Sequence, residues 1–147
     1  MNSIIISKGM RLQMLLLVMV SMILSCSSMI AVFDQQAYLN ATTLKAEASA
    51  LMDQATEPYV NHTDEVRAFR IHIDAAYEYA NGLPKNELTA RQWKVLKDPE
   101  GNLLGGFFKL WGKNGTLLKG DIEANKKNIL EGFDEIIKLE AAKIKNN

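Results

Sequence analysis

Few residues of this 147-residue chain have the types and spacing that chemistry requires. Cys26 is the only cysteine, and no histidine or lysine lies close to it in the sequence to activate its thiol as a nucleophile. His62 follows Pro58 in a predicted loop, and His72 lies on a predicted helix with no carboxylate or second histidine one turn away. We therefore predict no catalytic residue and no metal-ligating set.

The other charged residues indicate solvated helix surfaces rather than a site. Glu131 and Glu135 lie one helical turn apart, as do Asp74 and Glu78, but nothing in the sequence indicates a polar pocket around either pair. The 17 basic and 17 acidic residues balance, and the basic ones do not cluster. The pattern is therefore not that of a nucleic-acid-binding or phosphate-binding protein, and no cofactor is expected.

The N-terminal residues 1–25 have the layout of a secretory signal. Lys8 and Arg11 precede an apolar core from Leu12 to Leu24, and small residues follow it. The tetrapeptide Ile23-Leu24-Ser25-Cys26 resembles the lipobox of bacterial lipoprotein precursors. That resemblance implies cleavage of the signal before Cys26 and a covalent lipid, with acyl chains such as palmitate, on the new N-terminal residue.

A lipid on Cys26 would attach the protein to a membrane. One acyl chain anchors a protein only marginally, whereas two or three hold it stably. The resemblance implies a periplasm-facing protein of the bacterial cell envelope, and Ser27 after the cysteine favours the outer membrane over the inner one. The chain is then divided into a signal peptide (1–25), a lipidated tether (26–33) and one folded domain (34–147), which resembles no characterised family.

Two other interpretations of the sequence remain open. The apolar run from Leu12 to Phe33 is long enough to span a bilayer without cleavage, with the C-terminal domain again outside the cytoplasm. Asn40, Asn61 and Asn114 each begin an N-glycosylation sequon, which would suit a eukaryotic glycoprotein.

The domain is predicted to be all-α. Apolar residues recur at alternating spacings of three and four within residues 34–56 and 63–83, and a broader apolar stripe runs through 121–145. We expect Asn61 or Thr63 to cap the second of these helices, and Gly82 can take a left-handed conformation at its end. Three long helices with narrow apolar seams predict an antiparallel bundle.

Residues 83–120 are too long for a simple connection between the second and third long helices. Thr89 and Gln92 form a capping box that predicts a short helix from Ala90 to about Leu96. A second short helix is predicted after Asn102, ending at the glycines near residue 115. The expected fold is therefore an antiparallel bundle of three long helices, with two short helices in this connection.

The connection also carries four large aromatic residues, for which two interpretations remain. They could form a partly exposed patch that binds a protein partner or, at the same end, an apolar ligand. Alternatively, they could cover the open end of the bundle as core. The four residues are Trp93, Phe107, Phe108 and Trp111.

The function expected from these features is a membrane-anchored lipoprotein with a non-enzymatic protein-binding or structural role at the bacterial envelope. The first alternative is a helical carrier or sensor that binds an apolar small molecule or an acyl chain. The second is an enzyme whose site is assembled from distant residues. No nucleic-acid partner is expected, and a homo-oligomer remains open because alanine-rich seams suit packing within or between chains.

Overall fold

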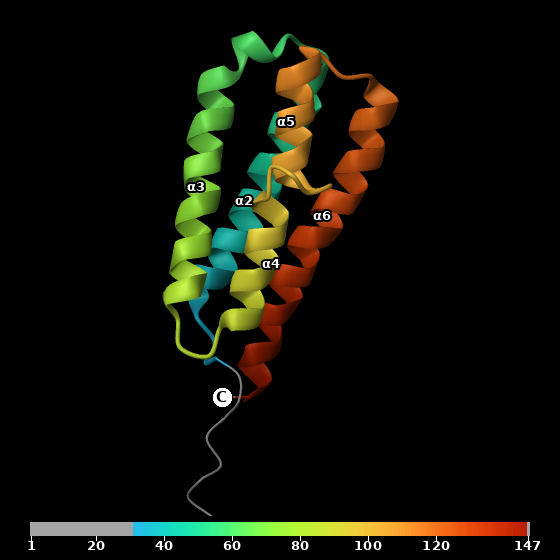
Figure 1. Cartoon of the computed structure of the whole chain (residues 1–147). Coiled ribbons are helices and arrows are strands. Elements are labelled where there is room, and N and C mark those ends of the chain that lie inside the picture. The colour runs from blue at the N-terminus through green and yellow to red at the C-terminus, as the bar shows by residue number, and fades with distance from the viewer. Residues whose placement is uncertain (1–30, 147) are drawn as a thin grey trace, which may run out of the picture.

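The computed structural model describes residues 31–146, and within that range its regular secondary structure is all helical, with no β-strand (Figure 1). The all-α prediction is therefore confirmed for the described residues. Cys26 and the predicted signal lie outside them. The α-helices are α2 (Gln35–Asp53), α3 (Thr63–Gly82), α4 (Glu87–Lys97), α5 (Leu104–Asn114) and α6 (Lys119–Ala142), and the 3-10 helices are η1 (Gln54–Thr56), η2 (Tyr59–Asn61) and η3 (Lys143–Asn146).

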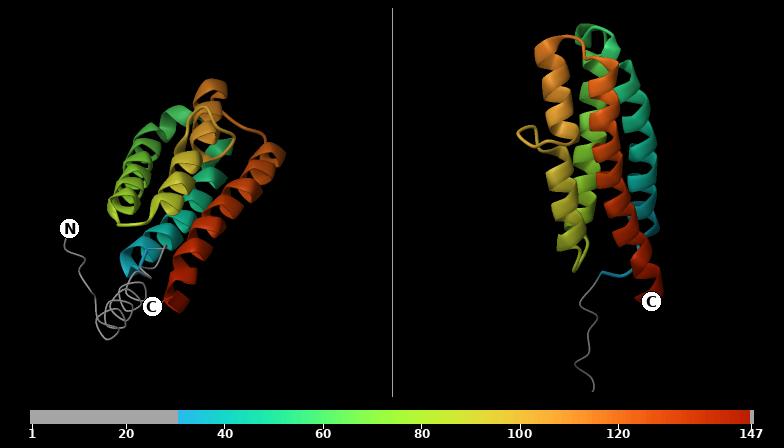
Figure 2. Two further views of the ribbon diagram at one scale, coloured as in Figure 1. Left: turned by 60° about the horizontal axis from the view of Figure 1, so that its bottom comes forward. Right: turned by 90° about the vertical axis from the view of Figure 1, so that its right-hand side faces the viewer.

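The helices form a bundle of four columns (Figures 1 and 2). α2 and α3 run in opposite directions, α4 and α5 follow each other along the third column, and α6 returns antiparallel to α2. α2 packs against α3 and α6, and α4 packs against the same two helices from the other side. The two short helices thus lie along the side of the long helices and do not close one end of them.

The two ends of the bundle are named here for use below. The base holds residues 31–34, the α3–α4 connection and η3. The tip, at the opposite end, holds residues 54–62 and the α5–α6 connection at 115–118. Backbone hydrogen bonds join the two parts of the tip, from Tyr59 N to Gly115 O (2.7 Å) and from Leu117 N to Ala55 O (2.8 Å).

The predicted seam of α2 faces the core. Asp34 caps this helix, with its carboxylate accepting a hydrogen bond from the backbone N–H of Ala37 (2.8 Å). Small side chains at these positions let α3 and α6 approach closely. The buried residues of the seam are Ala37, Ala41, Leu44, Ala48, Leu51 and Ala55.

Both ends of α3 differ in their details from the prediction. Thr63 does not cap the helix, because its hydroxyl donates back to the carbonyl of Tyr59 (3.2 Å). Gly82 is not left-handed, since Leu83 takes an extended conformation before Pro84 and ends the helix there. The left-handed residue is instead Lys85, with φ 60°.

The start of α4 also differs, and the predicted capping box is wrong. The helix begins at Glu87, so Thr89 lies inside its first turn and is buried. Asn86 precedes the helix, and its side-chain amide donates to the carbonyl of Ala80 at the end of α3 (2.8 Å). This bond holds the base ends of α3 and α4 together.

Candidate functional site

The four predicted surface aromatics lie in the core. Trp93, Phe107, Phe108 and Trp111 are each at most 2% exposed. The prediction of a partly exposed aromatic patch is therefore wrong, because the α4–α5 column turns these side chains inward against the long helices. Trp93 packs edge-to-face on Phe133 of α6, with 5.9 Å between the ring centroids.

Trp111 connects the core to the tip. Its indole N–H donates to the carbonyl of Glu57 (3.0 Å), so the buried polar atom of the ring is satisfied. The rings of Tyr59 and His62 each pack on it, with centroids 5.3 Å away. The end of α5 is thus fastened to residues 57–62.

His62 forms a polar cluster at the tip that the sequence prediction missed. Its Nδ1 lies 3.0 Å from a carboxylate oxygen of Glu65, and its Nε2 lies 3.0 Å from one of Glu57. Carboxylates accept hydrogen bonds only, so both contacts are hydrogen bonds only when the imidazole is protonated. The bond to Glu65 is the main cause that raises the pKa of His62 above its ordinary value; burial opposes it and Glu57 supports it.

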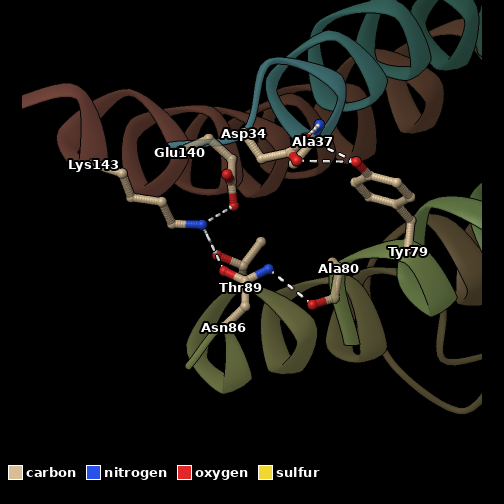
Figure 3. Close-up of polar contacts among 8 residues, drawn as sticks. All are labelled: Asp34, Ala37, Tyr79, Ala80, Asn86, Thr89, Glu140 and Lys143. Atoms are coloured by element: carbon tan, nitrogen blue, oxygen red, sulfur yellow. Dashed lines mark hydrogen bonds and ion pairs between the residues drawn. The ribbon is translucent and has the colours of Figure 1, made fainter. Parts of the chain in front are cut away.

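A second polar cluster lies at the base and is deeply buried (Figure 3). The ammonium of Lys143 donates to a carboxylate oxygen of Glu140 (2.5 Å) and to the side-chain oxygen of Asn86 (2.5 Å), with the Thr89 hydroxyl 3.5 Å away. The other carboxylate oxygen of Glu140 has no hydrogen-bond partner among the described residues. The cluster connects α6 to the start of α4 and, through Asn86, to the end of α3.

The described chain enters the bundle beside this cluster. Ala31 is buried, and its N–H donates to the carbonyl of Lys85 in the α3–α4 connection (3.2 Å). The Tyr79 hydroxyl donates to the carboxylate of Asp34 (3.0 Å), which raises the pKa of that tyrosine (Figure 3). Residues 31–34 are therefore attached to the α3–α4 connection and to α3.

A groove lies where α4 ends and α5 begins, against α3. We call it the junction groove; its volume is about 380 Å³. Three buried apolar side chains form its floor, and charged residues from α3, α4 and the α4–α5 connection form its rim. The floor residues are Ile73, Leu104 and Phe108, and the rim residues are Arg70, Asp74, Lys94, Lys97 and Asp98.

Two glycines at the start of α5 allow it to pack closely, Gly105 against the end of α4 and Gly106 against the α4–α5 connection. A Cβ atom on Gly105 would lie 2.2 Å from the carbonyl oxygen of Lys97, and one on Gly106 would lie 1.9 Å from that of Gly101. Both contacts are with backbone atoms, which cannot move aside as a flexible side chain can. The glycine-rich stretch of the sequence therefore has a packing role in the column.

Comparison of the chain with protein-family models, curated proteins and solved structures found no match. Within residues 31–146, no helix is both long and apolar enough to cross a membrane. In the same range, no three histidine, cysteine, aspartate or glutamate side chains are grouped so as to hold a metal ion.

Proposed function

We propose that the chain is the precursor of a lipid-anchored protein of the bacterial cell envelope, with a non-enzymatic binding or structural role. In this proposal the signal is removed before Cys26, and the lipid on that residue holds the bundle at the membrane surface, with the outer membrane favoured. The long helices α2, α3 and α6 act as an antiparallel scaffold, and the α4–α5 column fills its open side.

The attachment of Ala31 at the base is the observation that supports this proposal most. Only residues 27–30 lie between Cys26 and Ala31. Five fully extended residues reach at most about 18 Å. An anchor at Cys26 would therefore keep the base close to the membrane, with the tip directed away from it. α6 alone has 24 residues, or about 36 Å of helix, so the base and the tip would lie at clearly different distances from the membrane surface.

The second candidate function is that of a carrier or sensor for a partly apolar ligand. The junction groove favours it, because the groove combines an apolar floor with a charged rim. It is compatible with a lipid anchor, since the groove lies on the side of the bundle and not at the base.

The first experiment is the intact mass of the protein extracted from the membranes of its host. We expect the mass of residues 26–147 plus acyl chains, and a Cys26→Ser variant should not be lipidated. Ser28→Ala is the matched control and should be processed normally. The mass of the complete, unmodified chain would overturn the proposal and leave a membrane-spanning N-terminus as the explanation.

The orientation has a separate test in lipid vesicles. In the mature protein Cys26 is blocked by its lipid, so a single new cysteine can carry a fluorescent label. Leu88 at the base and Leu118 at the tip are both exposed, at 49% and 75%. Nitroxide-labelled lipids should quench a label on Leu88→Cys and leave one on Leu118→Cys unquenched. Equal quenching at the two sites would contradict the orientation.

A further inference from the structure

The junction groove has unequal charges on its rim. Three cations and two carboxylates line it, which leaves one excess positive charge. The ammonium of Lys97 is neutralised by Asp74 (2.7 Å) and also lies 4.3 Å from the ring centre of Tyr77. One carboxylate oxygen of Asp98 accepts the backbone N–H of Glu100 (2.9 Å). These three rim residues therefore already have partners.

The remaining two cations have no carboxylate partner within the described part of the chain. The guanidinium of Arg70 lies 5.7 Å from the ring centre of Phe108, which leaves its N–H groups free to donate to a ligand. The side-chain ammonium of Lys94 makes no hydrogen bond or ion pair with any described residue. Two neighbouring helices, α3 and α4, thus each contribute an available cation to one groove.

The interior of the same groove is apolar. Ile73, Leu104 and Phe108 form the floor, and Pro99 and the aliphatic stems of the rim lysines form the walls. A volume of about 380 Å³ is at the small end of the range for small-molecule sites. A purely apolar ligand would fill it but would desolvate Arg70 and Lys94 without a partner, at a cost in affinity.

We propose that the junction groove binds a small amphipathic anion, with a carboxylate-like head between Arg70 and Lys94 and a short apolar body over the floor. The head supplies the acceptors that the two cations lack, and charge-assisted hydrogen bonds are the stronger kind. The body covers apolar surface at the break of the α4–α5 column. This inference names the ligand class for the second candidate function and does not depend on the lipid anchor.

The test is a titration of the full chain, isotopically labelled and reconstituted in lipid nanodiscs, followed by NMR. Octanoate is the probe, and empty nanodiscs correct for its partition into lipid. We expect saturable shifts confined to amides around the groove, such as those of Asp98 and Gly105. Octyltrimethylammonium and octanol should bind at least about tenfold more weakly, because neither supplies an anionic head.

Acetate and inorganic phosphate test how much the anionic head contributes to binding without the apolar body. Both carry the anionic group without the apolar part, so both should bind at least about tenfold more weakly than octanoate. Equal binding of acetate, phosphate and octanoate would show a site for simple anions and overturn the amphipathic ligand. Shifts scattered over the whole bundle, or equal binding of the cationic probe, would overturn the site itself.

Variants test the two cations directly. Arg70→Gln combined with Lys94→Gln should weaken octanoate binding by about tenfold or more. Lys113→Gln is the matched control, because it removes an exposed cation from α5 that does not line the groove. All three positions are exposed, so the fold should persist, and unchanged NMR spectra of the unliganded variants would verify this. Unchanged affinity of the double variant would contradict the proposal.

Discussion

The base and the tip of the bundle use the same local arrangement in different surroundings. At the base, Lys143 lies between two acceptors, Glu140 and Asn86. At the tip, His62 lies between two acceptors, Glu57 and Glu65. The side chains of the Lys143–Glu140 pair are only 3% and 0% exposed, whereas those of Glu57 and Glu65 are 60% and 59% exposed. The two clusters therefore share the arrangement of one cation between two acceptors and differ in the solvent exposure of those side chains.

The difference in solvent exposure determines how much stability each cluster loses when one partner is removed. Ions removed from water depend fully on each other, so loss of one partner leaves an uncompensated buried charge. Exposed carboxylates keep their hydration, so their pairing with a cation contributes little. Loss of one partner should therefore cost more at the base than at the tip, where only the contacts of His62 change with the charge of its imidazole.

The largest expected effect is at the base. Lys143→Met removes the cation and leaves the Glu140 carboxylate buried without its ion-pair partner, which should lower the free energy of unfolding by about 3–5 kcal/mol. Chemical denaturation of the full chain measures the change.

The matched control for this variant replaces both members of the pair. Lys143→Met combined with Glu140→Leu leaves no buried charge behind and should recover most of the loss. If the single variant lost less than about 1 kcal/mol, the contrast between the buried base and the exposed tip would be refuted.

The sequence predicted the helices better than it predicted the base cluster. The seams of α2 and α3 follow a local periodicity, and nearly all of their residues are buried as expected. Lys143 and Glu140 belong to a predicted helix end where charges normally face water. Their burial results from the packing of α4, which begins at Glu87, whereas the capping box predicted at Thr89 placed its start at Ala90.

The second prediction concerns the α4–α5 junction that lies between the two ends. Gly105→Ala places a methyl group against backbone atoms of Lys97 and Asp98, and should cost about 1–3 kcal/mol in the free energy of unfolding. Gly82→Ala is the control, because nothing lies within 4 Å of its Cβ position and its φ is not positive. It should raise stability by about 0.4–1 kcal/mol.

Equal effects of the two glycine variants would show that the α4–α5 junction can relax to accept a side chain at residue 105. A clear difference, measured by the same denaturation experiment, would show that a close backbone contact holds α4 and α5 together between the base and the tip.

The aromatic residues show why the candidate site could not be predicted from sequence alone. The spacing of Phe107 and Trp111 is helical, but helical spacing does not say which side of a short helix is covered. Their burial depends on the α4–α5 column lying along the long helices, which in turn depends on Gly105 and Gly106. For the His62 cluster, the local indication in the sequence was Glu65, an acidic residue three positions later on α3.

A third and smaller effect is expected from a half-exposed contact at the base. Asp34→Ala removes the N-cap of α2 and should lower the free energy of unfolding by about 1 kcal/mol. Asp34→Asn keeps a side-chain oxygen for the N–H of Ala37 and should retain most of that stability. A loss as large as that of Lys143→Met would mean that position within the base, and not burial, sets the size of the effect.

The smallest effect is the pH dependence at the tip. The pKa of His62 is raised in the folded protein, so the imidazole is protonated in both states below the ordinary histidine value of about 6.5, where its stabilising contribution is complete. As the pH rises through the raised pKa of the folded state, that contribution is lost, because the neutral ring can donate to only one of its two carboxylates. The free energy of unfolding should therefore fall slightly as the pH rises from about 6.5 through the raised pKa, relative to a His62→Gln variant, whose side chain does not titrate. The same pH change should leave the difference between the Lys143→Met and Glu140→Leu double variant and the unsubstituted protein unaltered, since neither Lys143 nor Glu140 contacts the imidazole and the double variant leaves no buried carboxylate to titrate. A pH-dependent difference for this double variant would show that the two clusters are coupled along the bundle, whereas a flat one leaves the tip as the end that responds to pH.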